Sequence, residues 1–81
     1  MVRVLVVDDS SAIRLAVRGI LESLGMQVSE AVDGQAALEA VEREGCPDVM
    51  LLDWNMPKMN GLDCLKNFRA NNSNDGCCVV M

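Results

Sequence analysis

Val49-Met50-Leu51-Leu52-Asp53 is a run of four apolar residues that ends on a carboxylate. The run is too short for a helix, so it predicts a strand that is buried on both faces of a sheet. Pro57 follows and disfavours both a strand ladder and a helix interior at that point. A carboxylate at the end of a buried strand is costly unless it has a use, and the carboxyl ends of parallel strands are common ligand sites. Asp53 is therefore a candidate site residue; the alternative is that it only caps the loop that follows.

The start of the chain repeats this pattern. Val2–Val7 predicts a second buried strand, and Asp8 and Asp9 follow it directly. If the two strands are neighbours in a parallel sheet, ~4.8 Å apart, the three carboxylates converge on one edge. Carboxylates that close repel one another, so this edge needs a cation or raised pKa values. Oxygen ligands without His favour Mg²⁺, and a carboxylate beside Mg²⁺ can act as a nucleophile toward phosphorus.

Helix and strand patterns alternate between these two strands. Ser10 or Ser11 is a natural N-cap for a helix that ends at Gly25. A weak strand over Gln27–Ala31 follows, and then a helix that includes Ala36–Val41. The first helix is predicted to bury Ile13, Val17, Ile20, Leu21 and Leu24 and to turn Arg14, Arg18 and Glu22 toward water.

The last part of the chain continues the alternation. Asn60 is a natural N-cap for a third helix, with Asp63 in its first turn, and Cys77–Met81 predicts a fourth strand. The resulting order β-α-β-α-β-α-β predicts one α/β domain over residues 1–81, built on a parallel sheet with right-handed crossovers.

Composition excludes several other classes of protein. A net charge of −5 argues against direct nucleic-acid binding. No apolar run is long enough for a membrane span or a signal peptide, so we expect a cytoplasmic protein. The chain has four cysteines, none in a C-x-x-C pair, and no histidine, so a zinc site is not expected and the thiols should be reduced.

Two motifs resemble a known family. Val6-Val7-Asp8-Asp9-Ser10, taken together with Leu52-Asp53-Trp54-Asn55-Met56-Pro57 and Asn60-Gly61, is similar to the receiver domain of two-component response regulators. The second motif is most similar to that of the single-domain chemotaxis regulators. The resemblance implies a flavodoxin-like, doubly wound parallel sheet with strand order 2-1-3-4-5 and a site where the first and third strands meet.

The resemblance also implies roles for the site residues. Asp53 would be the phosphoacceptor, Asp9 a direct ligand of Mg²⁺, and Asp8 a second acid that often acts through water. Asn55 would offer its backbone carbonyl to the metal. A sensor histidine kinase would be the phosphodonor, and the domain would not itself be an enzyme.

The chain also departs from the family pattern. Receiver domains of this family are longer, and their Ser/Thr, Lys and aromatic switch positions would lie beyond Met81. In the family, the Lys and the hydroxyl hold the phosphoryl oxygens. We therefore expect an incomplete receiver domain whose phosphotransfer and output are impaired. The outer edge of the Cys77–Met81 strand would also be a surface on which a homodimer could form.

Two alternatives from other classes stay open. Haloacid dehalogenase-like phosphatases also use a nucleophilic Asp and Mg²⁺, but they need a second Asp where this chain has Asn55. The other alternative is an inert metal-binding or dimerising fragment.

Overall fold

The computed structural model describes residues 1–53, 66, 69 and 78–80. Lys66 and Arg69 are helical, and the rest of the predicted third helix lies outside the described residues. In chain order, the described elements are β1 (Arg3–Val7), α1 (Ser11–Ser23), β2 (Gln27–Ala31), α2 (Gly34–Glu44), β3 (Val49–Leu52) and β4 (Cys78–Val80).

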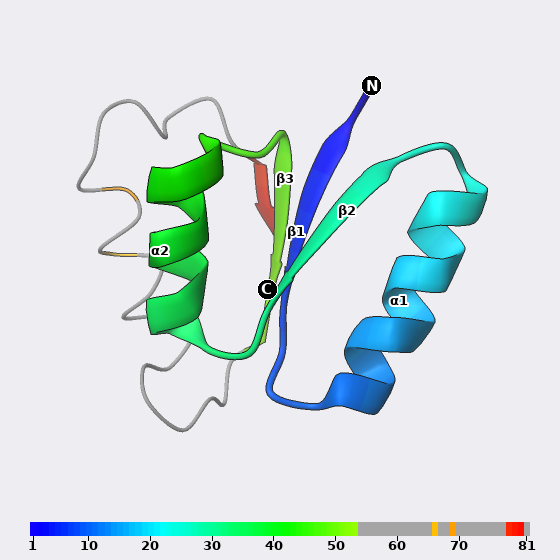
Figure 1. The fold of residues 1–81 in the computed structure, drawn as a ribbon, viewed down its shortest axis with the longest axis horizontal. Helices are drawn as coiled ribbons and strands as arrows, with labels where there is room; N and C mark the ends of the chain where they lie inside the picture. Colours follow the sequence, from blue (N-terminus) through cyan, green and yellow to red (C-terminus); the bar gives the residue numbers. More distant parts are fainter. Residues whose placement is uncertain (54–65, 67–68, 70–77, 81) are drawn as a thin grey trace.

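The strands form one parallel sheet in the order β2-β1-β3-β4 (Figure 1). This order agrees with the predicted α/β fold and places β1 between β2 and β3. Val7 at the end of β1 lies level with Ala31 of β2 and with Leu52 of β3. The carboxyl ends of these three strands therefore share one edge of the sheet, and Asp8 and Asp53 come directly after two of them.

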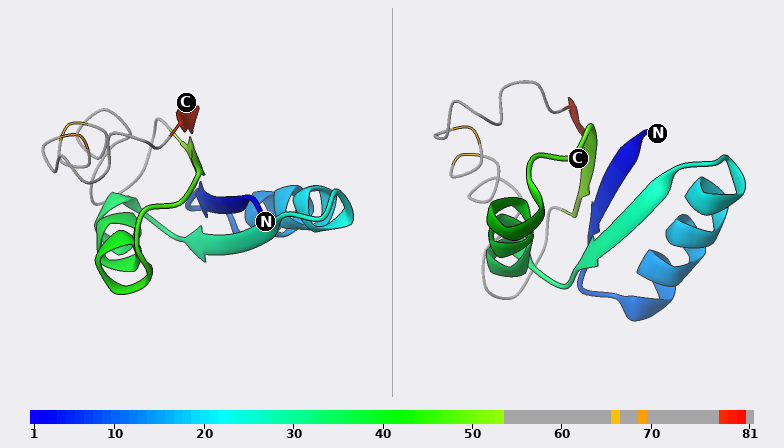
Figure 2. Two further views of the ribbon diagram at one scale, coloured as in Figure 1. Left: turned by 90° about the horizontal axis from the view of Figure 1, so that it is seen from above. Right: turned by 45° about the horizontal axis from the view of Figure 1, so that its top comes forward.

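Helices α1 and α2 cover opposite faces of the sheet (Figures 1 and 2). Alternation along β1 sends Leu5 and Val7 to the face under α2, and Val4 and Val6 to the face under α1. The larger of the two cores lies under α2, where Met50 and Val7 are almost completely buried. Strands β1 and β3 are thus apolar on both faces, as their runs of aliphatic residues predict.

Helix α1 differs from its predicted orientation. Val17 and Leu21 pack against the sheet, but Ile13, Ile20 and Leu24 are 52%, 62% and 67% exposed, so that part of the predicted buried stripe is wrong. Arg14, predicted to face water, has a side chain only 13% exposed. Arg14, Val17 and Leu21 occupy positions i, i+3 and i+7, so they share one side of the helix. Ion pairs from Arg14 and Arg18 to Glu30 of β2 hold that side toward the sheet.

Local signals fix the ends of both helices. Ser10 is the N-cap of α1 and accepts a hydrogen bond from the amide of Ile13. Asp33 caps α2 in the same way, through the amide of Ala36, although its sequence Asp-Gly also fits a hairpin turn. Gly25 and Gly45, with φ of 86° and 88°, follow the two helices in a conformation that side-chain-bearing residues rarely adopt.

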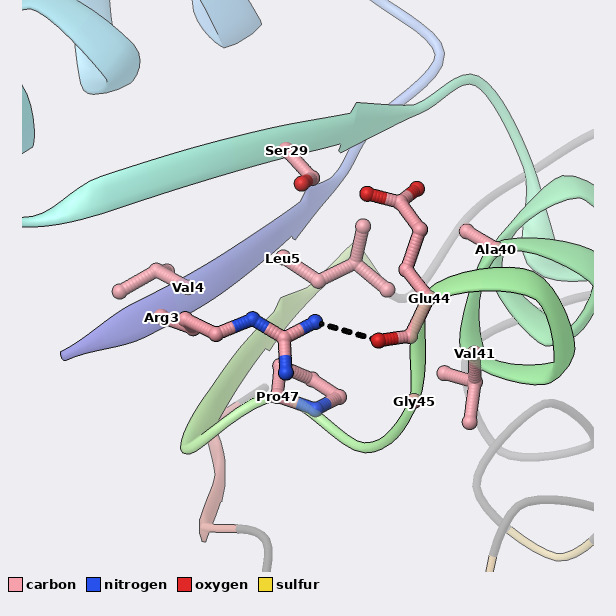
Figure 3. Close-up of a pocket in the computed structure, with 9 residues that line it drawn as sticks. All are labelled: Arg3, Val4, Leu5, Ser29, Ala40, Val41, Glu44, Gly45 and Pro47. Atoms are coloured by element: carbon pink, nitrogen blue, oxygen red, sulfur yellow. Dashed lines mark hydrogen bonds between the residues drawn. The ribbon is translucent and has the colours of Figure 1, made fainter. Parts of the chain in front are cut away.

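Arg3 ties the opposite edge of the sheet to the end of α2 (Figure 3). Its guanidinium donates to the carbonyl oxygen of Glu44 at 3.0 Å and to that of Cys46 at 3.4 Å, while its amide donates to a carboxylate oxygen of Asp48 at 2.8 Å. The hollow beside Arg3 has a volume of about 10 Å³, which is too small for a ligand. The contacts of Arg3 therefore stabilise the fold.

Among the described residues, no helix has the length and apolar character needed to cross a membrane.

Candidate metal centre

Three carboxylates meet at the carboxyl edge of the sheet. One carboxylate oxygen from each of Asp8, Asp9 and Asp53 lies within 4.8 Å of the others. The predicted convergence of these side chains is therefore present, because β1 and β3 are hydrogen-bonded neighbours. Their action as metal ligands, and that of Asn55, stays a prediction, and Asn55 lies outside the described residues.

The backbone holds the ends of the two strands in register. The amide of Asp53 donates to the carbonyl oxygen of Val7 at 2.9 Å, and the amide of Asp8 donates to that of Ala31 at 3.1 Å. Each bond continues the parallel ladder by one residue past the end of a strand. Asp8 and Asp53 therefore start from fixed backbone positions and are half-buried, whereas Asp9, one residue further along, is exposed.

The loop after β1 has its own internal hydrogen bond. The amide of Ser10 donates to Oδ1 of Asp8 at 2.9 Å, which orients the Asp8 carboxylate and satisfies one amide at the start of α1. One oxygen of Asp8 is thus engaged within the loop. Among the described residues, its other oxygen has no hydrogen-bond partner that would keep it from a further interaction at the edge of the sheet.

The donor set fits a hard divalent cation. The cluster contains only carboxylate oxygens, and the sequence has no histidine to draw a softer metal. Mg²⁺ is usually held by one or two carboxylates and several waters, which suits a partly exposed cluster of this kind. Bringing a divalent cation among three negative charges would also relieve their mutual repulsion.

An open hollow of about 210 Å³ adjoins the cluster. Asp8 and Asp53 are among the residues that line it, and the remaining lining residues are apolar: Val6, Val7, Ile13, Val17, Leu51, Leu52 and Val80. The carboxylates thus border a space that is large enough for a small group to approach them.

Arg14 is a residue at this edge that sequence reasoning missed. Its Nη1 donates to the carbonyl oxygen of Asp8 at 2.6 Å, and its Nε pairs with Glu30 at 3.1 Å. Its place three residues before the partly buried Val17 was a signal that it could face the sheet. Hydrogen bonds from Arg18, and then from Arg14, lower the pKa of Glu30 from its ordinary value.

Comparisons with known proteins agree with this arrangement. The family model of the response regulator receiver domain matches residues 4–81. Chemotaxis protein CheY1 of Helicobacter pylori is 45% identical over 71 residues, which are 86% of this chain and 57% of that protein. Chemotaxis protein CheY-3 of Vibrio cholerae is 45% identical over 69 residues, which are 84% of this chain and 52% of that protein.

Solved structures give the same result. The match to the chemotaxis protein CheY4 of Vibrio cholerae has a TM-score of 0.91 and 35% identity, and it covers 98% of this chain and 65% of the CheY4 chain. The response regulator TrrA of Thermotoga maritima was solved in complex with Mg²⁺-BeF. Its match has a TM-score of 0.81 and 34% identity, and it covers 86% of this chain and 60% of the TrrA chain.

The chain spans a little over half the length of these curated relatives. The matched residues nevertheless include both acidic motifs and, apart from Arg3 at the start of β1, every described strand. By its sequence and by its flavodoxin-like parallel sheet, the chain belongs to the response regulator receiver domain family.

Proposed function

We propose that this chain carries the phosphoacceptor site of a two-component response regulator, with Asp53 as the residue that takes the phosphoryl group. The observation that carries the proposal is the cluster of Asp8, Asp9 and Asp53, whose oxygens lie within 4.8 Å of one another at the switch point between β1 and β3. Asp9 would be the direct ligand of Mg²⁺, with Asp8, Asp53 and the backbone carbonyl of Asn55 completing the set.

The chemistry follows from the position of Asp53. A carboxylate oxygen of Asp53 attacks phosphorus, and a new O–P bond forms as the bond between phosphorus and the donor's leaving atom breaks. The donor keeps the electron pair of the broken bond, and the product is an aspartyl phosphate. Mg²⁺, when bound, neutralises negative charge on the phosphoryl oxygens. The ladder bond from the amide of Asp53 to Val7 fixes the nucleophile's backbone during the transfer.

The family supports a particular class of donor. Receiver domains take their phosphate from histidine kinases, so the donor would carry a phosphohistidine and the transfer would take place in the cytoplasm. Relatives that are chemotaxis proteins support chemotaxis as the signalling context. The relative solved with Mg²⁺-BeF supports the choice of metal.

Labelling by a small acyl phosphate in the presence of Mg²⁺ tests the proposal. Because phosphotransfer is expected to be impaired in this chain, labelling should be slow, but intact mass should show one phosphoryl group on the protein, no label on Asp53→Asn, and label at the wild-type rate on Glu42→Gln, which changes an exposed acid of α2. Label without continued release of phosphate is the expected result. Multiple turnover would instead indicate a phosphatase, and absence of label on the folded protein would indicate an inert metal-binding domain.

A further inference from the structure

We propose that Arg14 is a positioning residue for the metal centre, because it fixes the peptide group that joins the two acidic residues Asp8 and Asp9. The inference rests on the proposed function, since it takes this cluster to be the Mg²⁺ site. It assigns a role to a side chain that would otherwise count as part of a surface ion pair.

The peptide group after Asp8 is held by the guanidinium. Nη1 of Arg14 donates to the carbonyl oxygen of Asp8 at 2.6 Å, a short hydrogen bond from a charged donor. A peptide group is planar, so a fixed carbonyl also fixes the direction of the next amide and Cα, which belong to Asp9. The amide and the carboxylate of Asp8 are held separately, by Ala31 and by Ser10.

This restraint matters most for Asp9. Its side chain is exposed, so packing does less to orient it than it does for the half-buried Asp8 and Asp53. The position of the Asp9 carboxylate therefore depends on the backbone of the loop between β1 and α1. Arg14 holds that backbone at the residue immediately before Asp9.

Arg14 is itself held in place. Its side chain is 13% exposed, and its Nε donates to Oε1 of Glu30 at 3.1 Å. Arg18 donates to the other carboxylate oxygen of Glu30 at 2.8 Å. Glu30 lies on β2 opposite Val6 of β1, so the planar guanidinium connects the loop rigidly to the sheet.

The ion pair with Glu30 also reduces the repulsion that the charge of Arg14 would exert on a bound cation. A guanidinium beside a cation site would repel the cation, but the carboxylate of Glu30 compensates the charge of Arg14. The two possible roles of Arg14 predict opposite signs. If only its charge mattered, removing it would strengthen Mg²⁺ binding; if it positions Asp9, removing it weakens Mg²⁺ binding.

A matched pair of variants separates these roles. Arg14→Met and Arg18→Met each remove one positive charge and one partner of Glu30 while keeping an unbranched stem, but only Arg14 contacts Asp8. The dissociation constant of Mg²⁺ is measured by calorimetry and by the fluorescence of Trp54, the one tryptophan of the sequence. We expect Arg14→Met to raise it by about tenfold, as losing an outer partner of a metal ligand does, and Arg18→Met to change it by less than about twofold.

Lysine variants at the same two positions test the role of Arg14 while the charge is kept. Arg14→Lys keeps the charge, but a lysine side chain cannot reach both Asp8 and Glu30 as a planar guanidinium does. The Arg14→Lys protein should therefore bind Mg²⁺ more weakly than the wild type, whereas the Arg18→Lys protein should not. Circular dichroism and melting curves of each variant establish that it is folded. Wild-type protein that binds no Mg²⁺ would overturn the proposed function itself. Wild-type protein that binds Mg²⁺, with Arg14 variants that bind equally well or better, would overturn only the role of Arg14.

Discussion

At the scale of single residues, the candidate site consists of three carboxylates whose mutual repulsion makes the site costly without a cation. Asp8 and Asp53 follow paired strands, so the backbone of the sheet brings their charges together whether or not a metal is bound. Folding stability and metal binding are therefore linked at this edge.

Replacement of Asp9 tests that link. Asp9→Ala removes one of three clustered negative charges, so without Mg²⁺ the variant should melt at a higher temperature than the wild type. Mg²⁺ at ten times its dissociation constant should stabilise the wild type by about 1.4 kcal/mol and the variant hardly at all. Melting curves with and without Mg²⁺ measure both effects, with Glu42→Gln as a control that keeps the wild-type response. A variant that responds to Mg²⁺ like the wild type would remove Asp9 from the site.

The ion pairs of Glu30 with Arg14 and Arg18 predict that the stability of the fold depends on pH. Because hydrogen bonds from Arg18 and Arg14 lower the pKa of Glu30 in the folded protein, its contribution is complete above the ordinary value of 4.5. That contribution is lost as the pH falls through the lower, folded-state pKa. At pH 7 the wild type should melt at a higher temperature than Glu30→Gln, with a free energy of unfolding larger by less than about 1 kcal/mol because the ion pairs are only partly buried, and this difference should shrink as the pH falls below 4.5. A difference that persists unchanged at low pH would contradict this origin.

At the scale of elements, the ends of helices and strands follow local signals that are easy to find in the sequence. Ser10 and Gly25 mark the ends of α1 as predicted, and the apolar runs mark β1 and β3. The rotation of α1 about its axis was not predictable in the same way. A pattern of apolar residues does not reveal that Glu30, on another element, draws Arg14 and the side of α1 that carries it toward the sheet.

Arg3 provides a test at this scale. Its guanidinium satisfies carbonyl oxygens of Glu44 and Cys46 at the end of α2, where helix carbonyls have no partner within the helix. Arg3→Met should therefore reduce the free energy of unfolding by about 1 kcal/mol. Arg43→Met is the matched control, because Arg43 is largely exposed and pairs only with its neighbour Glu44 among the described residues. Urea unfolding of the two variants should rank Arg3→Met as the less stable; equal stabilities would contradict the capping role.

At the scale of the whole molecule, the alternation of strands and helices predicted the parallel sheet, and the sheet in turn predicted the site. Two strands that both end in acid give a cluster only if they are neighbours, and the order β2-β1-β3-β4 makes them so. The sequence alone left open whether Asp53 was more than a loop cap, because a single residue at a strand end carries no information about which strand lies beside it. Spatial proximity to Asp8 and Asp9 supplies that information.

The most direct test of the central claim is the position of the phosphoryl group after treatment with an acyl phosphate and Mg²⁺. Peptide mapping by mass spectrometry, on protein whose aspartyl phosphate has been trapped chemically, identifies the modified residue. We expect Asp53 to carry the phosphoryl group and chelation of Mg²⁺ to prevent the phosphorylation. A phosphoryl group on any other residue, or an equal amount on Asp53 without Mg²⁺, would contradict this claim.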